Sequence, residues 1–177
     1  MAFPRFKAKK VGALAILTAL GLIAFLLESL LPSFYIPGAK AGISNVFSLL
    51  ALVIFGPIEA AMVVAVRTVL GSIIAGNPST LLYSFTAGEV SIVFASVLFG
   101  FFAKRLSLVS VSVASAAMHN TVQLFVYRLL SGSAAIYAIL PYLLLLGVIA
   151  GLIVGVVGVL AVKGVPYSVF ERLLDER

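Results

Sequence analysis

The chain has 177 residues, of which 63% are hydrophobic, and it carries a formal net charge of +6. Because it has no cysteine, one histidine and one aspartate, disulfides, thiol chemistry, a dedicated transition-metal site and catalysis by an aspartate pair are excluded. Nearly all of its length lies in long apolar runs, which predicts an all-α integral membrane protein with no room for a soluble catalytic domain.

Six apolar segments follow one another along the chain, and turn-forming residues such as Gly56-Pro57 and Ser131-Gly132-Ser133 separate them. Since a spanning helix needs about 20 apolar residues, the length allows about six crossings. We expect a six-transmembrane-helix bundle with helices at residues 10–31, 43–55, 58–76, 81–103, 107–130 and 136–162. This transmembrane domain, 10–162, lies between a basic leader, 1–9, and an amphipathic tail, 163–177.

The positive charge is concentrated at both ends of the chain and in the loop that contains Lys104 and Arg105. The intervening connections keep only Lys40 and Arg128. The positive-inside rule therefore predicts a multi-pass protein of a bacterial cell membrane with both termini in the cytoplasm. Basic residues at these places suit an anionic lipid surface, and no separate domain carries the charge that nucleic-acid binding would need.

The second apolar segment is too short to cross a bilayer. Its apolar part covers about 13 residues, or about 20 Å of helix, against a hydrocarbon core of about 30 Å. The preceding residues, 35–42, must make up the remaining depth as irregular backbone, which is tolerated only where protein buries it or a wet cavity borders it. We therefore expect this loop to fold over something.

Two charged residues of the third segment have different predicted roles. Arg67 lies deep in the helix and, because Glu59 is about 12 Å away along the axis, it needs a partner from another helix. Glu59 follows Pro57 closely and is predicted to be a structural acid in the first helical turn.

Polar residues of the fifth segment form one stripe. His119, Gln123 and Tyr127 follow at intervals of four, with Asn120 beside them. Such a stripe is untenable against lipid, so it faces either a cavity or neighbouring helices with which it forms hydrogen bonds. Both interpretations stay open at the level of sequence.

The stripe has counterparts on other segments. The fourth segment contributes Tyr83, Thr86 and Glu89 in its outer part, and Glu28, Lys40 and Asn45 fall at the same predicted depth. Together they predict an outward-facing polar pocket for a small molecule. Alternatively, Glu28 or Glu89 neutralises Arg67 or Arg128, and both interpretations can hold together.

Small residues mark two helix faces. Gly147, Gly151 and Gly155 recur every four residues in the sixth segment and predict close approach of a neighbouring helix. Ala15 and Ala19 form a shorter face on the first segment.

Several of these residues resemble a known family. The Pro-Gly-x-Lys-x-Gly-x-x-Asn run from Pro37 to Asn45, residues 27–32, Arg67, and residues 117–120 with Gln123 are similar to the Gx transporter family. Its members are often labelled heptaprenyl diphosphate synthase component I. That family is similar to the substrate-binding S components of energy-coupling factor (ECF) transporters.

The resemblance implies an S-component fold whose first loop closes over an outward-facing site. It also implies that Ala15 and Ala19 dock a transmembrane coupling subunit, which two cytosolic ATPases drive. The chain has no Gly-rich phosphate loop with the Lys-Ser/Thr pair of its own.

We therefore expect a substrate-binding subunit rather than an enzyme, without cofactor, metal site or catalytic residue, that takes up a vitamin-like, isoprenoid or quinone-precursor molecule. The alternative is a non-catalytic accessory subunit of a prenyl diphosphate synthase, because Asp175 alone cannot supply the Asp-rich magnesium motifs of such synthases. The predicted substrate-binding residues are Tyr35, Lys40, Asn45, Arg67, Glu89, His119, Asn120 and Gln123.

Overall fold

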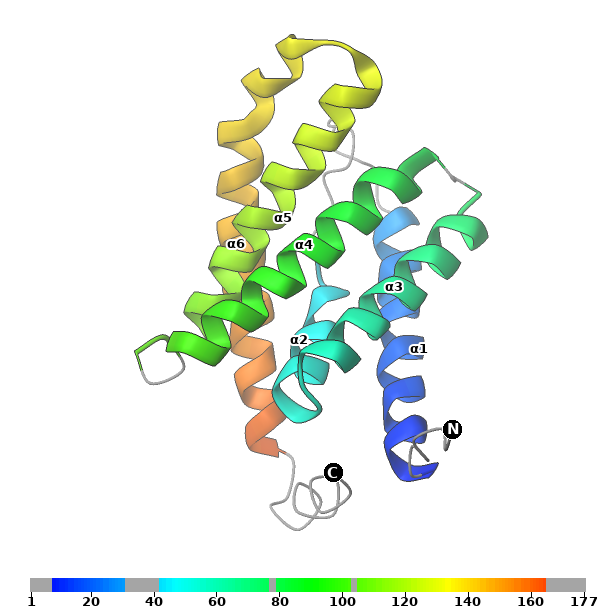
Figure 1. Ribbon diagram of the computed structural model, residues 1–177, viewed down its shortest axis with the longest axis vertical. Helices are drawn as coiled ribbons and strands as arrows, with labels where there is room; N and C mark the ends of the chain where they lie inside the picture. Colours follow the sequence, from blue (N-terminus) through cyan, green and yellow to red (C-terminus); the bar gives the residue numbers. More distant parts are fainter. Residues whose placement is uncertain (1–7, 31–41, 77–78, 103–104, 165–177) are drawn as a thin grey trace, which may run out of the picture.

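The computed structural model describes residues 8–30, 42–76, 79–102 and 105–164, and all of its regular elements there are helical. Figure 1 shows their arrangement. The elements are α1 (Ala8–Leu30), α2 (Asn45–Ile54), α3 (Pro57–Ile74), α4 (Ser79–Phe102), α5 (Leu108–Ser131), the 3₁₀ helix η1 (Ala134–Ile139) and α6 (Leu140–Gly164). Within these ranges the predicted all-α fold with six α-helices is confirmed. The predicted leader and tail lie almost wholly outside the described residues.

Five of the helical segments are long and apolar enough to cross a membrane: α1, α3, α4, α5 and the stretch from η1 through α6. Their outward surfaces carry large apolar side chains, such as Ile16, Leu82 and Leu160, which are more than half exposed. Because soluble proteins rarely expose so much contiguous apolar surface, these faces are suited to lipid. The chain is therefore a multi-pass membrane protein.

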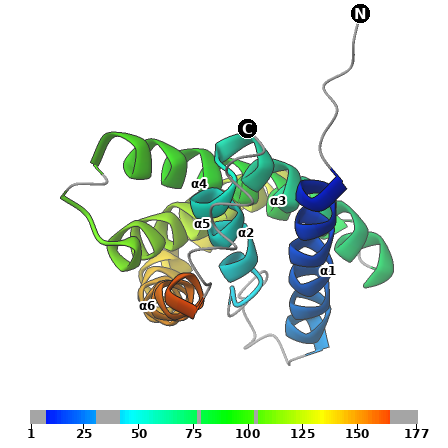
Figure 2. The same ribbon diagram turned by 90° about the horizontal axis from the view of Figure 1, so that it is seen from below.

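Helix α2 is the exception, as its sequence predicted. Its 10 residues correspond to about 15 Å of helix, half of a bilayer core. In Figure 1 it begins midway along the height of the bundle and runs toward the end where α1 begins. Seen from that end in Figure 2, α2 lies between α1 and α6, and it packs against both.

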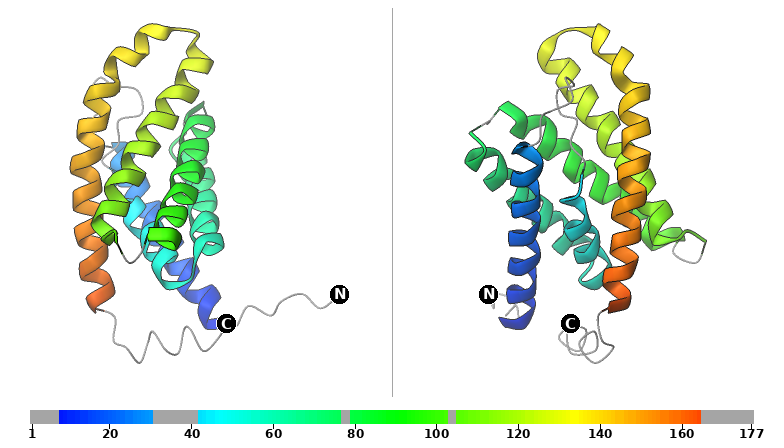
Figure 3. Two further views of the ribbon diagram at one scale, coloured as in Figure 1. Left: turned by 60° about the vertical axis from the view of Figure 1, so that its left-hand side comes forward. Right: turned by 180° about the vertical axis from the view of Figure 1, so that it is seen from behind.

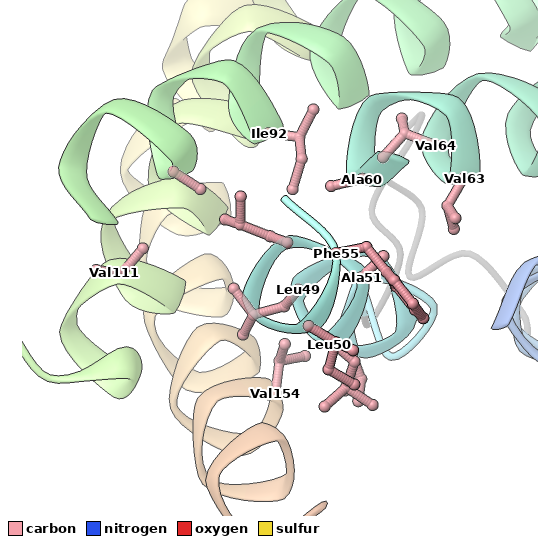
Figure 4. Close-up of a cluster of buried hydrophobic side chains, with 14 residues drawn as sticks. Leu49, Leu50, Ala51, Phe55, Ala60, Val63, Val64, Ile92, Val111 and Val154 are labelled. Carbon is pink, nitrogen blue, oxygen red and sulfur yellow. The ribbon is translucent and has the colours of Figure 1, made fainter. Parts of the chain in front are cut away.

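The core of the protein surrounds α2 because seven of the ten residues of this helix are buried and none is exposed. Leu49, Leu50 and Phe55 contact side chains from the neighbouring helices, among them Val64 of α3 and Val154 of α6 (Figure 4). An apolar helix that is buried on all sides cannot face lipid, so α2 acts as the central packing element of the bundle.

Helices α5 and α6 lie side by side as a hairpin in both views of Figure 3. A Cβ atom on Gly151 would lie 2.6 Å from Cα of Val113, and one on Gly155 would lie 2.7 Å from Cα of Val109. Only glycine permits this backbone approach, so the close packing predicted from the four-residue glycine spacing is confirmed.

Helix boundaries fall at the predicted turn residues. Gly56 adopts a φ of 115° immediately before Pro57, the first residue of α3, and Gly132 ends α5 with a φ of 71°. Positive φ values of this kind favour glycine over residues with a Cβ. The side chain of Ser107 accepts a hydrogen bond from the Ser110 amide and so caps the start of α5.

At the end of the bundle where α1 begins, Lys10 forms an ion pair with Glu59 over 2.5 Å. Glu59 lies in the first turn of α3, where an acid also interacts favourably with the helix dipole. The predicted structural role of Glu59 is thus confirmed, and its partner comes from α1.

Candidate functional site

A cavity lies among the helices, directly beside the apolar core. Its empty volume, including the part that opens outward, is about 920 Å³. Leu49, Val64, Ile92 and Val154 belong both to its wall and to the core cluster labelled in Figure 4. Cavities with apolar walls and a few convergent polar groups are typical of small-molecule sites in helical bundles.

Arg67 of α3 is the most deeply buried charged residue of the cavity wall, with 3% of its surface exposed. Its Nη2 donates a hydrogen bond to Oδ1 of Asn45 over 3.1 Å, and its charge interacts with Glu28 and Glu89. The predicted partner from another helix is therefore present. Among the described residues, however, Nε and Nη1 of Arg67 have no hydrogen-bond acceptor.

Glu28 of α1 also borders the cavity, but its carboxylate holds the start of α2. It accepts hydrogen bonds from the backbone amide of Ile43 and, over 3.1 Å, from the hydroxyl of Ser44. The amides that precede a helix need such acceptors because they have no partner within the helix. Glu28 therefore fixes where α2 begins and lies close enough to Arg67 to offset part of its charge.

The polar stripe of α5 faces inward. His119 and Gln123 line the cavity, and Gln123 is 7% exposed. Nδ1 of His119 lies 3.5 Å from Oγ of Ser91 on α4, and the Ser115 hydroxyl donates to the Ser91 carbonyl over 3.0 Å. The stripe thus borders a cavity and also bonds to a neighbouring helix, so both sequence-based interpretations hold.

Asn120 joins α5 to α6. Its Nδ2 donates to the Leu143 carbonyl over 2.6 Å, and it occupies the space that a Cβ on Gly147 would need. Its side chain also lines the cavity. One of the two N–H donors of this amide is thus committed to helix packing, which leaves the other N–H and the side-chain oxygen as the groups that could meet a ligand.

The structure brings together five of the predicted binding residues around one cavity: Asn45, Arg67, His119, Asn120 and Gln123. Glu89 of α4 is not part of the cavity wall, although its carboxylate interacts with Arg67 and its Oε1 is buried without a hydrogen-bond partner in the described part of the chain. Tyr35 and Lys40 lie outside the described residues.

The other α4 residues assigned to the pocket do not line it. The prediction for Thr86 is wrong, because this side chain is exposed and bonds to the Leu82 carbonyl of its own helix. Tyr83 is buried but packs edge-on against Tyr127 of α5, with ring centroids 5.7 Å apart. Helix α4 therefore turns a different face to the cavity than the one expected.

That face consists of serines, which sequence reasoning missed. Ser84 and Ser91 line the cavity from α4, and Ser48 and Thr68 line it from α2 and α3. The sequence contains a spacing that could have indicated this polar face. Ser84 and Ser91 are seven residues apart and Ser48 follows Asn45 by three, and both spacings place the two residues on one face of a helix. Serine is common in membrane helices, so the signal is weak by itself.

The described residues contain no group of three or more His, Cys, Asp or Glu side chains that could hold a metal ion. The lining groups are instead hydrogen-bond donors and acceptors around an apolar space. This arrangement can hold and orient a small molecule.

Ala15 and Ala19, the predicted docking residues, are exposed on the outer surface of α1. The larger side chains of Ile16 and Leu20 flank them and are also exposed. The small residues are therefore accessible to another helix within the membrane.

The fold and the cavity define a multi-pass α-helical membrane protein with an internal polar site. The chain belongs to the family described as heptaprenyl diphosphate synthase component I, whose sequence model matches residues 17–160. No curated protein and no solved structure matches the chain. The family's description names one component of a synthase, which fits the expectation that this chain is a non-enzymatic membrane subunit.

Proposed function

We propose that this chain is the substrate-binding subunit of an ECF-type, ATP-driven importer of a vitamin-like or isoprenoid-related small molecule. The observation that carries the proposal is the cavity, in which Arg67 is buried with two unpartnered nitrogen atoms while other polar side chains converge around it. Burying an unsatisfied guanidinium is costly, so a site of this kind is more useful for binding than for stability.

The place of α2 supports the same proposal. A helix that begins midway along the bundle leaves the polar groups of its first turn, Asn45 and Ser48, beside the cavity rather than at the membrane surface. Discontinuous backbone at membrane depth is a recurring feature of transport sites. Tyr35 and Lys40, in the connection that precedes α2, complete the proposed set of ligand contacts.

In this proposal the chain captures its ligand from outside the cell, and partner proteins supply the energy. A transmembrane coupling subunit docks on the Ala15 and Ala19 face of α1, and two cytosolic ATPases bound to it drive reorientation and release of the ligand. The exposed position of both alanines is compatible with such docking.

The proposal is tested by purifying the tagged protein gently from its native membrane and identifying the proteins that accompany it by mass spectrometry. We expect a transmembrane coupling protein with ATPases. Ala19→Leu should abolish this association because the larger side chain blocks close helix approach. The matched control is Gly100→Leu, since a side chain there points into open space and only adds bulk to the lipid-facing surface.

A second function is favoured by the family description alone: a non-catalytic membrane component that accompanies a heptaprenyl diphosphate synthase. It predicts that the same purification recovers a soluble prenyl synthase without ATPases, and that Ala19→Leu has no effect. Ligand binding provides a further distinction. An importer subunit should lose affinity for its cargo in Gln123→Ala without loss of folded protein, whereas an anchor has no need of the cavity.

A further inference from the structure

The cavity holds unused hydrogen-bonding groups on one wall. Nε and Nη1 of Arg67 and Oγ of Ser48 are buried and have no partner among the described residues, and both side chains line the cavity from α3 and α2. Buried donors without acceptors cost free energy that a bound acceptor would recover. This wall can therefore donate further hydrogen bonds to oxygen or nitrogen acceptors of a ligand.

Three other hydroxyls around the cavity are already engaged. Ser91 donates to the Gly88 carbonyl over 2.9 Å, and Ser115 donates to the Ser91 carbonyl over 3.0 Å. Ser44 donates to Glu28 over 3.1 Å. The wall formed by α2 and α3 thus offers a ligand's polar group buried donors without a partner, which these three serines do not.

Charge restricts what that polar group can be. Arg67 already interacts with two carboxylates, Glu28 and Glu89, so these three charges sum to −1, and Lys40 of the proposed contact set would raise the sum only to zero. A further anion would meet two acids against one guanidinium where the dielectric is low and repulsion is strong. A cation would lack the lone pairs that Arg67 requires.

The wall formed by α6 is apolar. Ala150, Gly151 and Val154 of α6 line the cavity and offer no side-chain polar atom, whereas α5 lines it with polar side chains such as His119 and Gln123. A ligand that spans the cavity therefore has an apolar or aromatic face against α6 and an acceptor-bearing end at α2 and α3.

We propose that the cavity selects an electrically neutral ligand that presents carbonyl-type acceptor oxygens to Arg67 and Ser48, and that it disfavours carboxylates and phosphates. This inference rests on the proposed binding function and adds the chemical class of the ligand. A diphosphate group carries several negative charges, so we expect it to bind more weakly than any other group considered beside the two carboxylates near Arg67.

Three probes that share a naphthalene ring distinguish a neutral ligand from a carboxylate and a phosphate: 2-naphthamide, 2-naphthoate and 2-naphthyl phosphate. Binding to the full chain in phosphatidylcholine nanodiscs is measured by equilibrium dialysis, with protein-free nanodiscs as the blank. The amide and the carboxylate have nearly the same shape, so their difference reports charge. We expect saturable binding of the amide, about tenfold or more tighter than that of either anion.

Two serine variants locate the bound acceptor. Ser48→Ala should weaken naphthamide binding about threefold to tenfold through the loss of one hydrogen bond. Ser72→Ala is the matched control, because Ser72 is likewise buried with an unpartnered hydroxyl but does not line the cavity. Its affinity should stay within about twofold of the unmodified chain.

An anion that binds as tightly as the amide overturns the inference while leaving a ligand-binding subunit in place. Equal effects of the two serine variants, or no saturable binding of the amide, also overturn it. None of these results bears on the co-purifying proteins, whose identity tests the proposed function separately.

Discussion

Arg67 on α3 donates a hydrogen bond to Asn45, the first residue of α2, over 3.1 Å, and so ties the start of the short central helix to a long membrane-spanning one. The two residues are separated by 22 positions in the sequence. Glu28 of α1 bonds to the residues just before Asn45, so both α1 and α3 hold the start of α2. The position of α2 therefore depends on this polar group as well as on apolar packing.

Replacing Asn45 with alanine removes the only hydrogen-bond acceptor that the described residues give Arg67. We expect the free energy of unfolding to fall by about 1–3 kcal/mol, because a buried charged donor is left without a partner. Titration with dodecyl sulfate in mixed micelles measures this change. Ser72→Ala is the control, as it removes a buried hydroxyl that has no partner; an equal loss in both variants would show that the bond to Arg67 contributes nothing.

Glu28→Gln keeps the size of the side chain but removes its charge from the start of α2. We expect a loss of about 1–2 kcal/mol, since an acid at a helix start stabilises the unpaired amides and the helix dipole there. Hydrogen exchange at the Ile43 amide should accelerate, because this amide donates to the carboxylate. Thr18→Ala in the same helix is the control, as its hydroxyl bonds only within α1 to the Leu14 carbonyl. Unchanged exchange at Ile43 would contradict the role given to Glu28.

The helices and the short second segment could be predicted from the sequence because each depends on local properties. A long apolar run predicts a spanning helix, and Gly56-Pro57 predicts a helix boundary, independently of residues elsewhere in the chain. The inward direction of His119 and Gln123 could be predicted for a similar reason, since polar side chains on one stripe cannot face lipid.

The pairing of the charged residues could not be predicted. Lys10 and Glu59 are 49 positions apart and Arg67 and Asn45 are 22 apart, so no periodicity within one helix identifies these partners. The inward face of α4 was misjudged because Thr86 satisfies its hydroxyl within its own helix and can therefore face outward. Such a threonine carries little information about direction.

Gly151→Ala should separate α5 from α6. The added methyl group would lie 2.6 Å from Cα of Val113 and 3.1 Å from the Ser112 carbonyl oxygen, and because both are backbone atoms a helix must shift. We expect a loss of about 1–3 kcal/mol in the free energy of unfolding. Gly100→Ala is the matched control, since nothing lies within 4 Å of its added methyl group. A loss at Gly100 equal to that at Gly151 would point to a general effect of removing glycine rather than to helix contact.

The positions of the charged residues predict the orientation of the chain in the membrane. In Figure 1 the starts of α1 and α5 and the end of α6 all lie in the lower half of the bundle. Lys9, Lys10, Arg105 and Lys163 belong to these three places. The positive-inside rule predicts that this half faces the cytoplasm and that the turn between α5 and η1 faces the outside.

Because the chain has no cysteine, single cysteines introduced at chosen sites can report this orientation directly. Ser133→Cys, in the exposed turn after α5, should react with a membrane-impermeant maleimide in intact cells. Gly164→Cys, exposed at the end of α6, should react only after the cells are permeabilised. The reverse labelling would place the termini outside, and the face of α1 at Ala15 and Ala19 would then lie in the outer half of the membrane, away from any cytosolic ATPase.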